Sequence, residues 1–124
     1  MKSISNPATS INMIDNLFAN KHGIRLASVD DAFEIIGSGL PGMIFTLDDI
    51  DPSFFTLKNQ ILGNTFQKLI NYHFPIAVVL PEDHAFGMRV TELAREHARH
   101  NTIRFCRTLE EAVIWMDNKI NTCN

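Results

Sequence analysis

The run from Ile76 to Leu80 contains only apolar residues and stands between Pro75 and Pro81. Because apolar and polar residues do not alternate in it, the run predicts a strand with both faces buried. Such strands are usual in parallel sheets that helices cover on both sides. Pro75 ends any helix before the run, since a proline disfavours helical geometry in the residue that precedes it. The run therefore predicts the buried middle strand of an α/β fold.

The preceding segment predicts one long helix that begins at Asp51. The Asp51 carboxylate suits an N-cap, and Pro52 suits the first helical position, where its missing N–H costs nothing. The apolar side chains of this segment cover an arc of about 220° on a helix, wider than a one-sided surface helix needs. They are Phe54, Phe55, Leu57, Ile61, Leu62, Phe66, Leu69 and Ile70. Such a helix either lies deep in the fold or shares part of its apolar surface with a partner.

The remaining chain divides into short alternating elements. In order, we expect a loose lead-in over 1–10, a helix or the first arm of a hairpin over 11–19, a second arm over 24–27, a helix over 28–36, strands over 42–47 and 103–106, helices over 85–100 and 108–120, and a polar tail over 121–124. The hairpin is the preferred interpretation of residues 11–27, and the helix remains open. The repeated strand–helix order from residue 42 predicts parallel strands with right-handed crossovers. With the hairpin, it predicts a single α/β domain over 11–120 with a mixed sheet of four or five strands.

Composition restricts the class of protein. A chain of 124 residues with 45% hydrophobic residues suits one domain with one core. The net charge of −3 argues against dominant electrostatic binding to nucleic acid or to acidic membranes. No run is long enough to span a membrane, and no secretion signal is present, so we expect a cytoplasmic protein. Cys106 falls in a predicted strand and Cys123 in the tail, which disfavours a disulfide.

Several segments resemble a known family. Phe54-Phe55-x-Leu57-Lys58, Phe66-Gln67-Lys68-Leu69-x-Asn71-Tyr72, Ile76-Ala77-Val78-Val79 and Leu109-Glu110-Glu111-Ala112 are similar to domain-of-unknown-function family 4180, an uncharacterised bacterial family. The resemblance covers about residues 24 to 116 and implies no assigned activity. The chain departs from it at Thr56, at Leu62-Gly63-Asn64 and at Pro81-Glu82-Asp83, where the family places other residues, acids among them. A site built from those acids would have to be rebuilt here.

The order of elements is also similar to that of STAS domains, the anti-sigma-factor-antagonist fold. In that family a strand leads into a helix whose first turn carries a phosphorylatable serine. Ser53 occupies the corresponding place, where a phosphate would face the N–H groups of a helix start. Pro52 and two phenylalanines surround it, in place of the small residues of the antagonist pattern. An ordinary helix-start serine is the competing interpretation, and regulation through Ser53 is a hypothesis.

Acidic residues follow two predicted strands. Asp48 and Asp49 follow the strand over 42–47, and Asp83 and His84 follow Leu80. If these strands are adjacent and parallel, the groups meet at the carboxyl edge where open α/β sheets bind ligands. Asp48, Asp49 and Asp83 are then candidate Mg²⁺ ligands, and Asp48, Asp83 and His84 are candidate acid–base residues. The competing interpretation is that these are solvated loops.

A basic segment runs through the predicted helix and strand near residue 100, and it contains Arg95, His97, Arg99, His100, Arg104 and Arg107. It could bind phosphate or RNA. Glu92 and Glu96 are interleaved and no aromatic platform accompanies the arginines, which favours a salt-paired helix surface over nucleic-acid binding. The histidines lack zinc spacing, and no glycine loop for a nucleotide follows a strand, so we expect no cofactor.

Trp115, Phe54 and Phe55 are the candidate interface residues, because Trp115 falls off the apolar stripe of the last helix and the phenylalanines belong to the wide apolar helix. They predict a protein partner or self-association, including a homodimer. The preferred function is a non-catalytic binding or regulatory module that acts through protein contacts. The alternative is a small enzyme or metal-dependent phosphate-handling protein that uses the acidic edge.

Overall fold

The computed structural model describes residues 14, 16–55, 61–81, 83 and 87–122. In this part of the chain the strands are β1 (Met43–Phe45), β2 (Ile76–Val79) and β3 (Ile103–Cys106), and the α-helices with assigned bounds are α2 (Asp30–Ile36), α3 (Ile61–Asn71), α4 (Met88–Glu96) and α5 (Leu109–Thr122). Three short 3-10 helices are η1 (Ala19–Lys21), η2 (Leu47–Asp49) and η3 (Pro52–Phe55). Strands and helices alternate from β1 onward, as expected.

The sheet is parallel, with strand order β1-β2-β3. Ile76 of β2 lies opposite Met43 of β1 on one side and Ile103 of β3 on the other. Every residue of β2 is buried. The prediction that this run forms the hidden middle strand of a parallel sheet is therefore confirmed.

The described residues form a three-stranded sheet, and the expected mixed sheet of four or five strands is not present in them. Two segments that were expected to form a hairpin instead make single parallel bridges, Phe18 with Ile44 and Leu26 with Ile50. The 3-10 helix η1 and Gly23, with a φ of +67°, turn the chain away after the first bridge. Each of these segments thus pairs with a different part of the 43–50 region, and the described part of 11–27 forms no hairpin.

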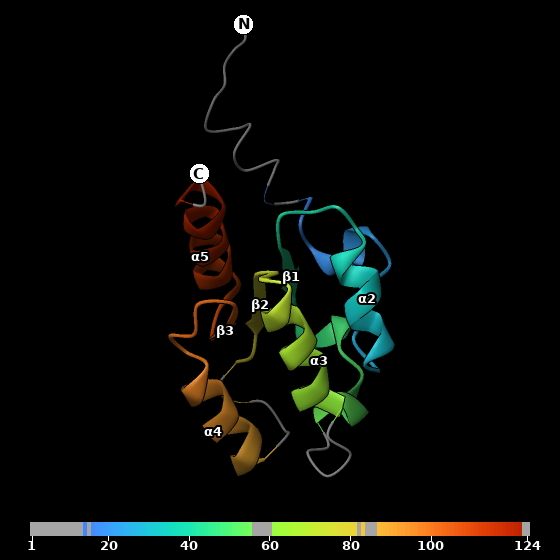
Figure 1. The fold of residues 1–124 in the computed structure, drawn as a ribbon. Coiled ribbons are helices and arrows are strands. Elements are labelled where there is room, and N and C mark those ends of the chain that lie inside the picture. The colour runs from blue at the N-terminus through green and yellow to red at the C-terminus, as the bar shows by residue number, and fades with distance from the viewer. Residues whose placement is uncertain (1–13, 15, 56–60, 82, 84–86, 123–124) are drawn as a thin grey trace, which may run out of the picture.

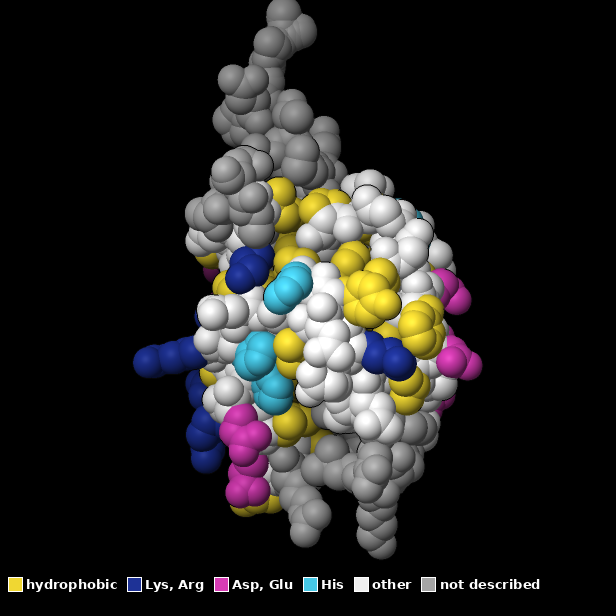
Figure 2. Space-filling model, in the orientation of Figure 1, with side chains coloured by type: hydrophobic (Ala, Val, Ile, Leu, Met, Phe, Trp, Pro, Cys, Tyr) yellow, Lys and Arg dark blue, Asp and Glu magenta, His cyan; other side chains and the backbone are white. Residues whose placement is uncertain are grey.

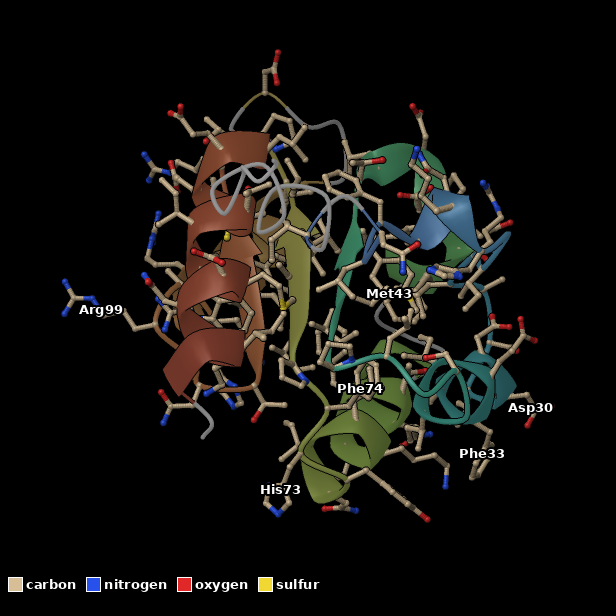
Figure 3. All side chains as sticks on the ribbon, turned by 90° about the horizontal axis from the view of Figure 1, so that it is seen from above. Asp30, Phe33, Met43, His73, Phe74 and Arg99 are labelled. Carbon is tan, nitrogen blue, oxygen red and sulfur yellow. The ribbon has the colours of Figure 1, made fainter. Side chains whose placement is uncertain are left out.

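Side chains alternate between the two faces of the sheet and so define two apolar layers. Met43, Phe45, Ile76, Val78, Leu80, Ile103 and Phe105 pack toward α2, α3 and Val90 of α4. Ile44, Ala77, Val79 and Cys106 pack toward Ala112 and Met116 of α5 and toward Ile14 and Leu17. Figure 3 shows the result from above, with α5 on one side of the strands and α2 and α3 on the other. Figure 1 shows α4 beside β3 and α3, below α5.

The predicted long helix from Asp51 is wrong at its start. Asp51 does cap a helical turn, since its Oδ1 accepts hydrogen bonds from the Ser53 N–H at 3.0 Å and the Ser53 hydroxyl at 2.7 Å. That turn is the 3-10 helix η3, and α3 begins at Ile61. Residues 56–60 lie outside the described residues. Pro52 and Asp51 therefore mark the start of a short turn rather than of the main helix.

The later elements follow the sequence more closely. The predicted helix over 85–100 is shorter in the structure, because α4 starts after Gly87, whose φ is +96°, and ends at Glu96. Residues 85 and 86 lie outside the described residues. Strand β3 has the predicted bounds, and α5 extends to Thr122, two residues into the expected tail. Among the residues that the structure describes, no helix is long and apolar enough to cross a membrane.

Candidate functional site

The connections at the carboxyl edge of the sheet leave in opposite directions. After β2 the chain passes to α4, which packs on the same face as α3, and after β3 it passes to α5 on the other face. Where neighbouring parallel strands send their connections to opposite faces, a crevice opens outside their carboxyl ends. The structure has a cavity of about 400 Å³ at this place. This volume lies in the range of small-molecule sites in proteins.

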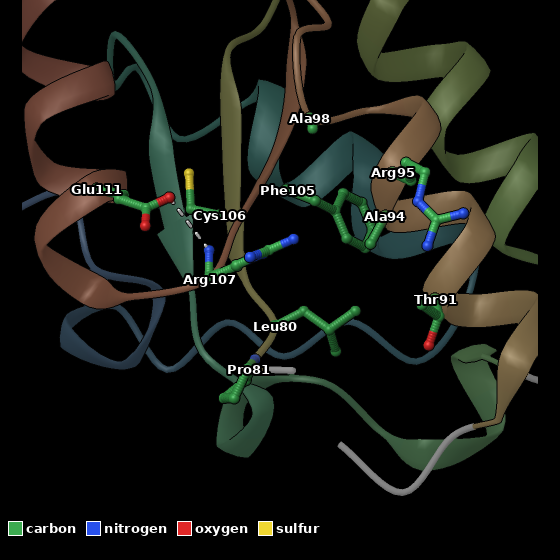
Figure 4. Close-up of a pocket in the computed structure, with 10 residues that line it drawn as sticks. All are labelled: Leu80, Pro81, Thr91, Ala94, Arg95, Ala98, Phe105, Cys106, Arg107 and Glu111. Atoms are coloured by element: carbon green, nitrogen blue, oxygen red, sulfur yellow. Dashed lines mark hydrogen bonds between the residues drawn. The ribbon is translucent and has the colours of Figure 1, made fainter. Parts of the chain in front are cut away.

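Residues in or next to β2, β3, α4 and α5 line the cavity (Figure 4). Leu80 and Pro81 follow β2, and Phe105, Cys106 and Arg107 come from β3 and the residue after it; Thr91, Ala94, Arg95 and Ala98 come from α4 and the turn after it; Glu111 comes from the first turn of α5. The lining therefore combines an apolar base with polar groups on its walls. Small side chains on α4 leave the space that a larger residue would fill.

Two guanidinium groups belong to this lining. Arg95 lies near the end of α4, and Arg107 directly follows β3. In Figure 4 the Arg107 side chain extends from the strand end in the direction of α4, which carries Arg95. Both residues are exposed, and a guanidinium group presents a planar set of N–H donors with a positive charge. The crevice thus has a cation on each of two separate elements.

Glu111 is held by the start of α5. Its N–H donates a hydrogen bond to the Thr108 hydroxyl at 3.1 Å, and its Oε1 accepts one from the Arg107 N–H at 3.5 Å. The first of these bonds is half of a capping box. The second reaches the residue before the cap rather than the cap itself. The carboxylate therefore serves the helix start and lies on the Cys106 side of the cavity (Figure 4).

Cys106 contributes an inert thiol to the lining. Burial and, after it, the Glu111 carboxylate raise the pKa of Cys106 to about 11, while Arg104 acts in the opposite direction. A thiol with this pKa is almost fully protonated at neutral pH, and the thiolate is the nucleophilic form. Cys106 therefore packs as a small apolar residue.

The expected acidic site is not assembled in the described residues. Strands β1 and β2 are adjacent and parallel, as that hypothesis required. Asp49, however, turns inward and is 6% exposed, and its Oδ2 accepts hydrogen bonds from the Thr46 N–H at 2.9 Å and the Thr46 hydroxyl at 3.0 Å. Asp48 and Asp83 are exposed, and His84 lies outside the described residues. Within the described part of the chain, no three His, Cys, Asp or Glu side chains are grouped so as to hold a metal ion.

Ser53 lies in the four-residue turn η3, and not in the first turn of an α-helix. Its hydroxyl donates to Asp51, and this bond is the main cause that holds the pKa of Asp51 below its usual value, followed by the Ser53 N–H and the charge of Arg25. A phosphate on Ser53 would stand next to this carboxylate and repel it. The surroundings of Ser53 therefore differ from those of a helix-start phosphoserine.

The candidate interface residues lie in different environments. Phe54 is 1% exposed and its ring contacts Phe66 edge to face, with ring centroids 6.0 Å apart. Its ring belongs to the core and is not offered at the surface. Trp115 is half-buried, with the Arg104 guanidinium 5.2 Å and the Lys119 ammonium 5.9 Å from its ring centroid. The side chain of Phe55 lies outside the described residues.

Exposed apolar side chains occur on both layers, and Ile114 of α5, next to Trp115, is 55% exposed. Phe33 of α2 is 50% exposed and Tyr72, just after α3, is 60% exposed. The Lys68 ammonium lies 4.7 Å from the Phe33 ring centroid. Figure 2 shows hydrophobic side chains interrupted by basic ones and by white polar surface on the α2–α3 side. The apolar surface on this side is broken into small pieces.

The sequence indicated some of the residues that line the crevice but did not show that they form one site. Arg95 and Arg107 were noted as members of a basic segment, and a helix was predicted to start at residue 108. Thr91, Ala94 and Ala98 were missed, because small residues on a helix carry no signal of their own. The missing information was spatial, namely that α4 and α5 lie on opposite faces of the sheet.

Fold and crevice together define the class: a parallel α/β domain with a ligand-sized opening at the carboxyl edge of its last two strands. The chain belongs to the family described as "Domain of unknown function (DUF4180)", whose model matches residues 11–116. The family resemblance of the central segments is thereby confirmed. No curated protein and no solved structure was found to match the chain.

Proposed function

We propose that this chain is a non-catalytic binding or regulatory module that binds its ligand in the crevice between α4 and α5. The observation that supports the proposal is the cavity of about 400 Å³ at the point where the connections after β2 and β3 diverge. A pocket at such a point is the usual binding site of open α/β sheets. The order of elements expected from the sequence is similar to that of STAS domains, which act in regulation, and this similarity suits the same role.

The lining favours binding over catalysis. The Cys106 thiol has its pKa raised to about 11, which removes it as a nucleophile at neutral pH. The Glu111 carboxylate accepts a hydrogen bond from the Arg107 N–H at the start of α5. The remaining lining residues supply apolar contact and positive charge. These groups can hold and orient a ligand, and they offer no evident pair of proton donor and acceptor.

A role through protein contacts alone has weaker support. It was expected from Phe54 and Trp115, but Phe54 packs inside the core and the Trp115 ring is flanked by Arg104 and Lys119 of the same chain. The crevice is the better candidate because its lining combines space for a ligand with two guanidinium groups.

The test is NMR spectroscopy of the ¹⁵N-labelled protein with a mixed library of small molecules. We expect bound compounds to shift the amide signals of Leu80, Ala94 and Phe105 first. The variant Ala98→Trp should abolish these shifts, because Ala98 lines the cavity and is exposed, so an indole there occupies the opening without entering the core. Gln67→Trp, at an exposed position of α3, is the matched control and should leave binding unchanged. Shifts that gather elsewhere, or that survive Ala98→Trp, contradict the proposal.

A further inference from the structure

The charges of the crevice indicate which kind of ligand it takes. Arg95 and Arg107 face the same cavity from different elements, whereas the chain as a whole has a net charge of −3. Guanidinium groups are the side chains that best match carboxylate and phosphate oxygens, because their N–H donors form a planar fork. A pair of guanidinium groups on opposite walls of the cavity is therefore a better indication of the charge of the ligand than the net charge of the chain.

Acidic groups also lie near the crevice. Glu110 and Glu111 occupy the first turn of α5 and offset the positive end of that helix, so the helix end itself contributes little to anion binding. Among the described residues of the lining Glu111 is the one acid, and its carboxylate accepts a hydrogen bond from the Arg107 N–H. The attraction for an anion thus rests on the two guanidinium groups.

The base of the cavity has a different character. Leu80 and Phe105 belong to the apolar core layer under α4, and Ala94 packs against it. Ala98 and the protonated Cys106 add further surface without charge. An apolar base below charged walls favours a ligand with an apolar body as well as an anionic group, because each part then replaces its contacts with water by matching contacts.

We infer that the crevice binds a small molecule in which an oxyanion, a carboxylate or a phosphate, is attached to a compact apolar body. This inference rests on the proposed function and adds the class of ligand. A cavity of about 400 Å³ has room for about 13 water-sized groups, at the 30 Å³ that each water occupies in the liquid. A single ring or a short branched chain with one anionic group fits this space. Arg95 and Arg107 hold the oxyanion, and Leu80 and Phe105 contact the apolar body.

The experiment compares four probes by NMR titration: phenyl phosphate, benzoate, benzamide and inorganic phosphate. Phenyl phosphate or benzoate should bind at least tenfold more tightly than the neutral benzamide, and their relative affinities tell which oxyanion is preferred. Inorganic phosphate should bind more weakly than phenyl phosphate, because it lacks the apolar body. Arg95→Gln and Arg107→Gln should each weaken the favoured probe about tenfold, since each removes a charge-assisted hydrogen bond.

Arg99→Gln is the matched control for charge. Arg99 is exposed, does not line the cavity and extends away from the molecule in Figure 3. It should leave binding unchanged, whereas an equal loss in all three variants would show diffuse electrostatics and overturn the inference. Benzamide binding as tightly as the anions in the crevice would overturn the inference and leave the proposed function standing. If no probe or library compound shifts the crevice signals, both fail. The NMR spectrum of each variant shows whether it is folded. Arg95 lies on the exposed surface of α4, so Arg95→Gln is sufficient for the test if Arg107→Gln does not fold.

Discussion

Among single residues, His100 shows how the role of a histidine follows from its hydrogen bonds. Its Nδ1 lies 3.0 Å from the backbone nitrogens of both Thr102 and Ile103 and accepts both N–H groups. A ring nitrogen that accepts cannot carry a proton, so His100 is neutral with its proton on Nε2. The residue fixes the turn that leads into β3. The sequence excluded a zinc site from the spacing of the histidines, but it could not show this structural role.

The first prediction concerns the stability of the protein as a function of pH. Burial lowers the pKa of His100, and the neighbouring His97, Arg104 and Lys119 lower it further. The unfolded chain therefore binds this proton more tightly than the folded protein. The contribution of His100 to the free energy of unfolding is complete above pH 6.5, its ordinary pKa, and is lost as the pH falls below that value toward the lowered pKa.

Urea unfolding at a series of pH values between 7.5 and 5 measures this effect. His100→Asn keeps an acceptor oxygen but cannot be protonated, so its stability should fall less with decreasing pH than that of the wild type. His22→Asn, at an exposed position, should keep the slope of the wild type. An identical slope for the wild type and His100→Asn would refute the assignment.

Among the elements, the end of α3 is informative. The His73 N–H donates to the Ile70 carbonyl and the Phe74 N–H to the Leu69 carbonyl, both at 3.0 Å, which is the Schellman pattern of a helix C-terminus. His73 occupies the left-handed position of this motif, with a φ of +55°. Glycine is the usual residue there, because a side chain strains the backbone in this conformation.

The second prediction follows from this strain. His73→Gly should raise the free energy of unfolding by about 0.5–1 kcal/mol, since glycine adopts the left-handed conformation without the steric cost. Gln67→Gly in the interior of α3 should lower it by a similar amount, because there glycine only adds flexibility to the unfolded chain. Thermal unfolding followed by circular dichroism compares the two variants. A loss of stability in both would mean that position 73 carries no strain.

Local signals in the sequence predicted some elements better than others. Thr108 is followed by a long apolar stripe, and α5 starts where this cap predicts. Asp51 and Pro52 are equally good start signals, yet they begin a turn of four residues. A cap residue acts on the first turn alone, so it fixes where a helix starts and does not determine how long it is. The length of α3 depends on packing against the sheet, which local signals do not contain.

For the whole molecule, Gly42 is a point where the sheet and α5 meet. A methyl group added at Gly42 would lie 2.6 Å from the Met116 Sδ of α5 and 3.2 Å from the Pro75 carbonyl, just before β2. Real Cβ atoms essentially never show the first distance, and the second is tighter than most Cβ contacts. Glycine is therefore favoured here because β1, β2 and α5 approach each other closely, and not because of its backbone angles.

The third prediction tests this contact. Gly42→Ala should lower the free energy of unfolding by about 1–3 kcal/mol, because the added methyl group pushes α5 away from the sheet. Gly63→Ala is the matched control: Gly63 lies in α3 with open space around it, so alanine should raise stability by up to about 1 kcal/mol through its better helix propensity. Urea unfolding of both variants measures the difference. Equal effects of the two substitutions would contradict the close approach.

The global arrangement was predictable only in part. The apolar run at Ile76–Val79 carried enough information to place β2 in the middle of a parallel sheet, because both of its faces had to be covered. The N-terminal segment was misread, since its alternating residues fit a hairpin, whereas Phe18 and Leu26 each make one parallel bridge to the 43–50 region. The crevice could not be predicted, because it depends on which face of the sheet each helix covers.

The diverging connections after β2 and β3 have a consequence for how such a domain can change over time. The crevice exists because the backbone connections after β2 and β3 pass to opposite faces of the sheet, and this does not depend on which side chains surround it. Substitutions of residues that line the crevice can therefore change the ligand specificity while the fold stays the same. Domains with this chain path therefore bind their ligands at the same place in the fold. In the proposed role of this chain, the residues at positions 95 and 107 select which ligand binds there.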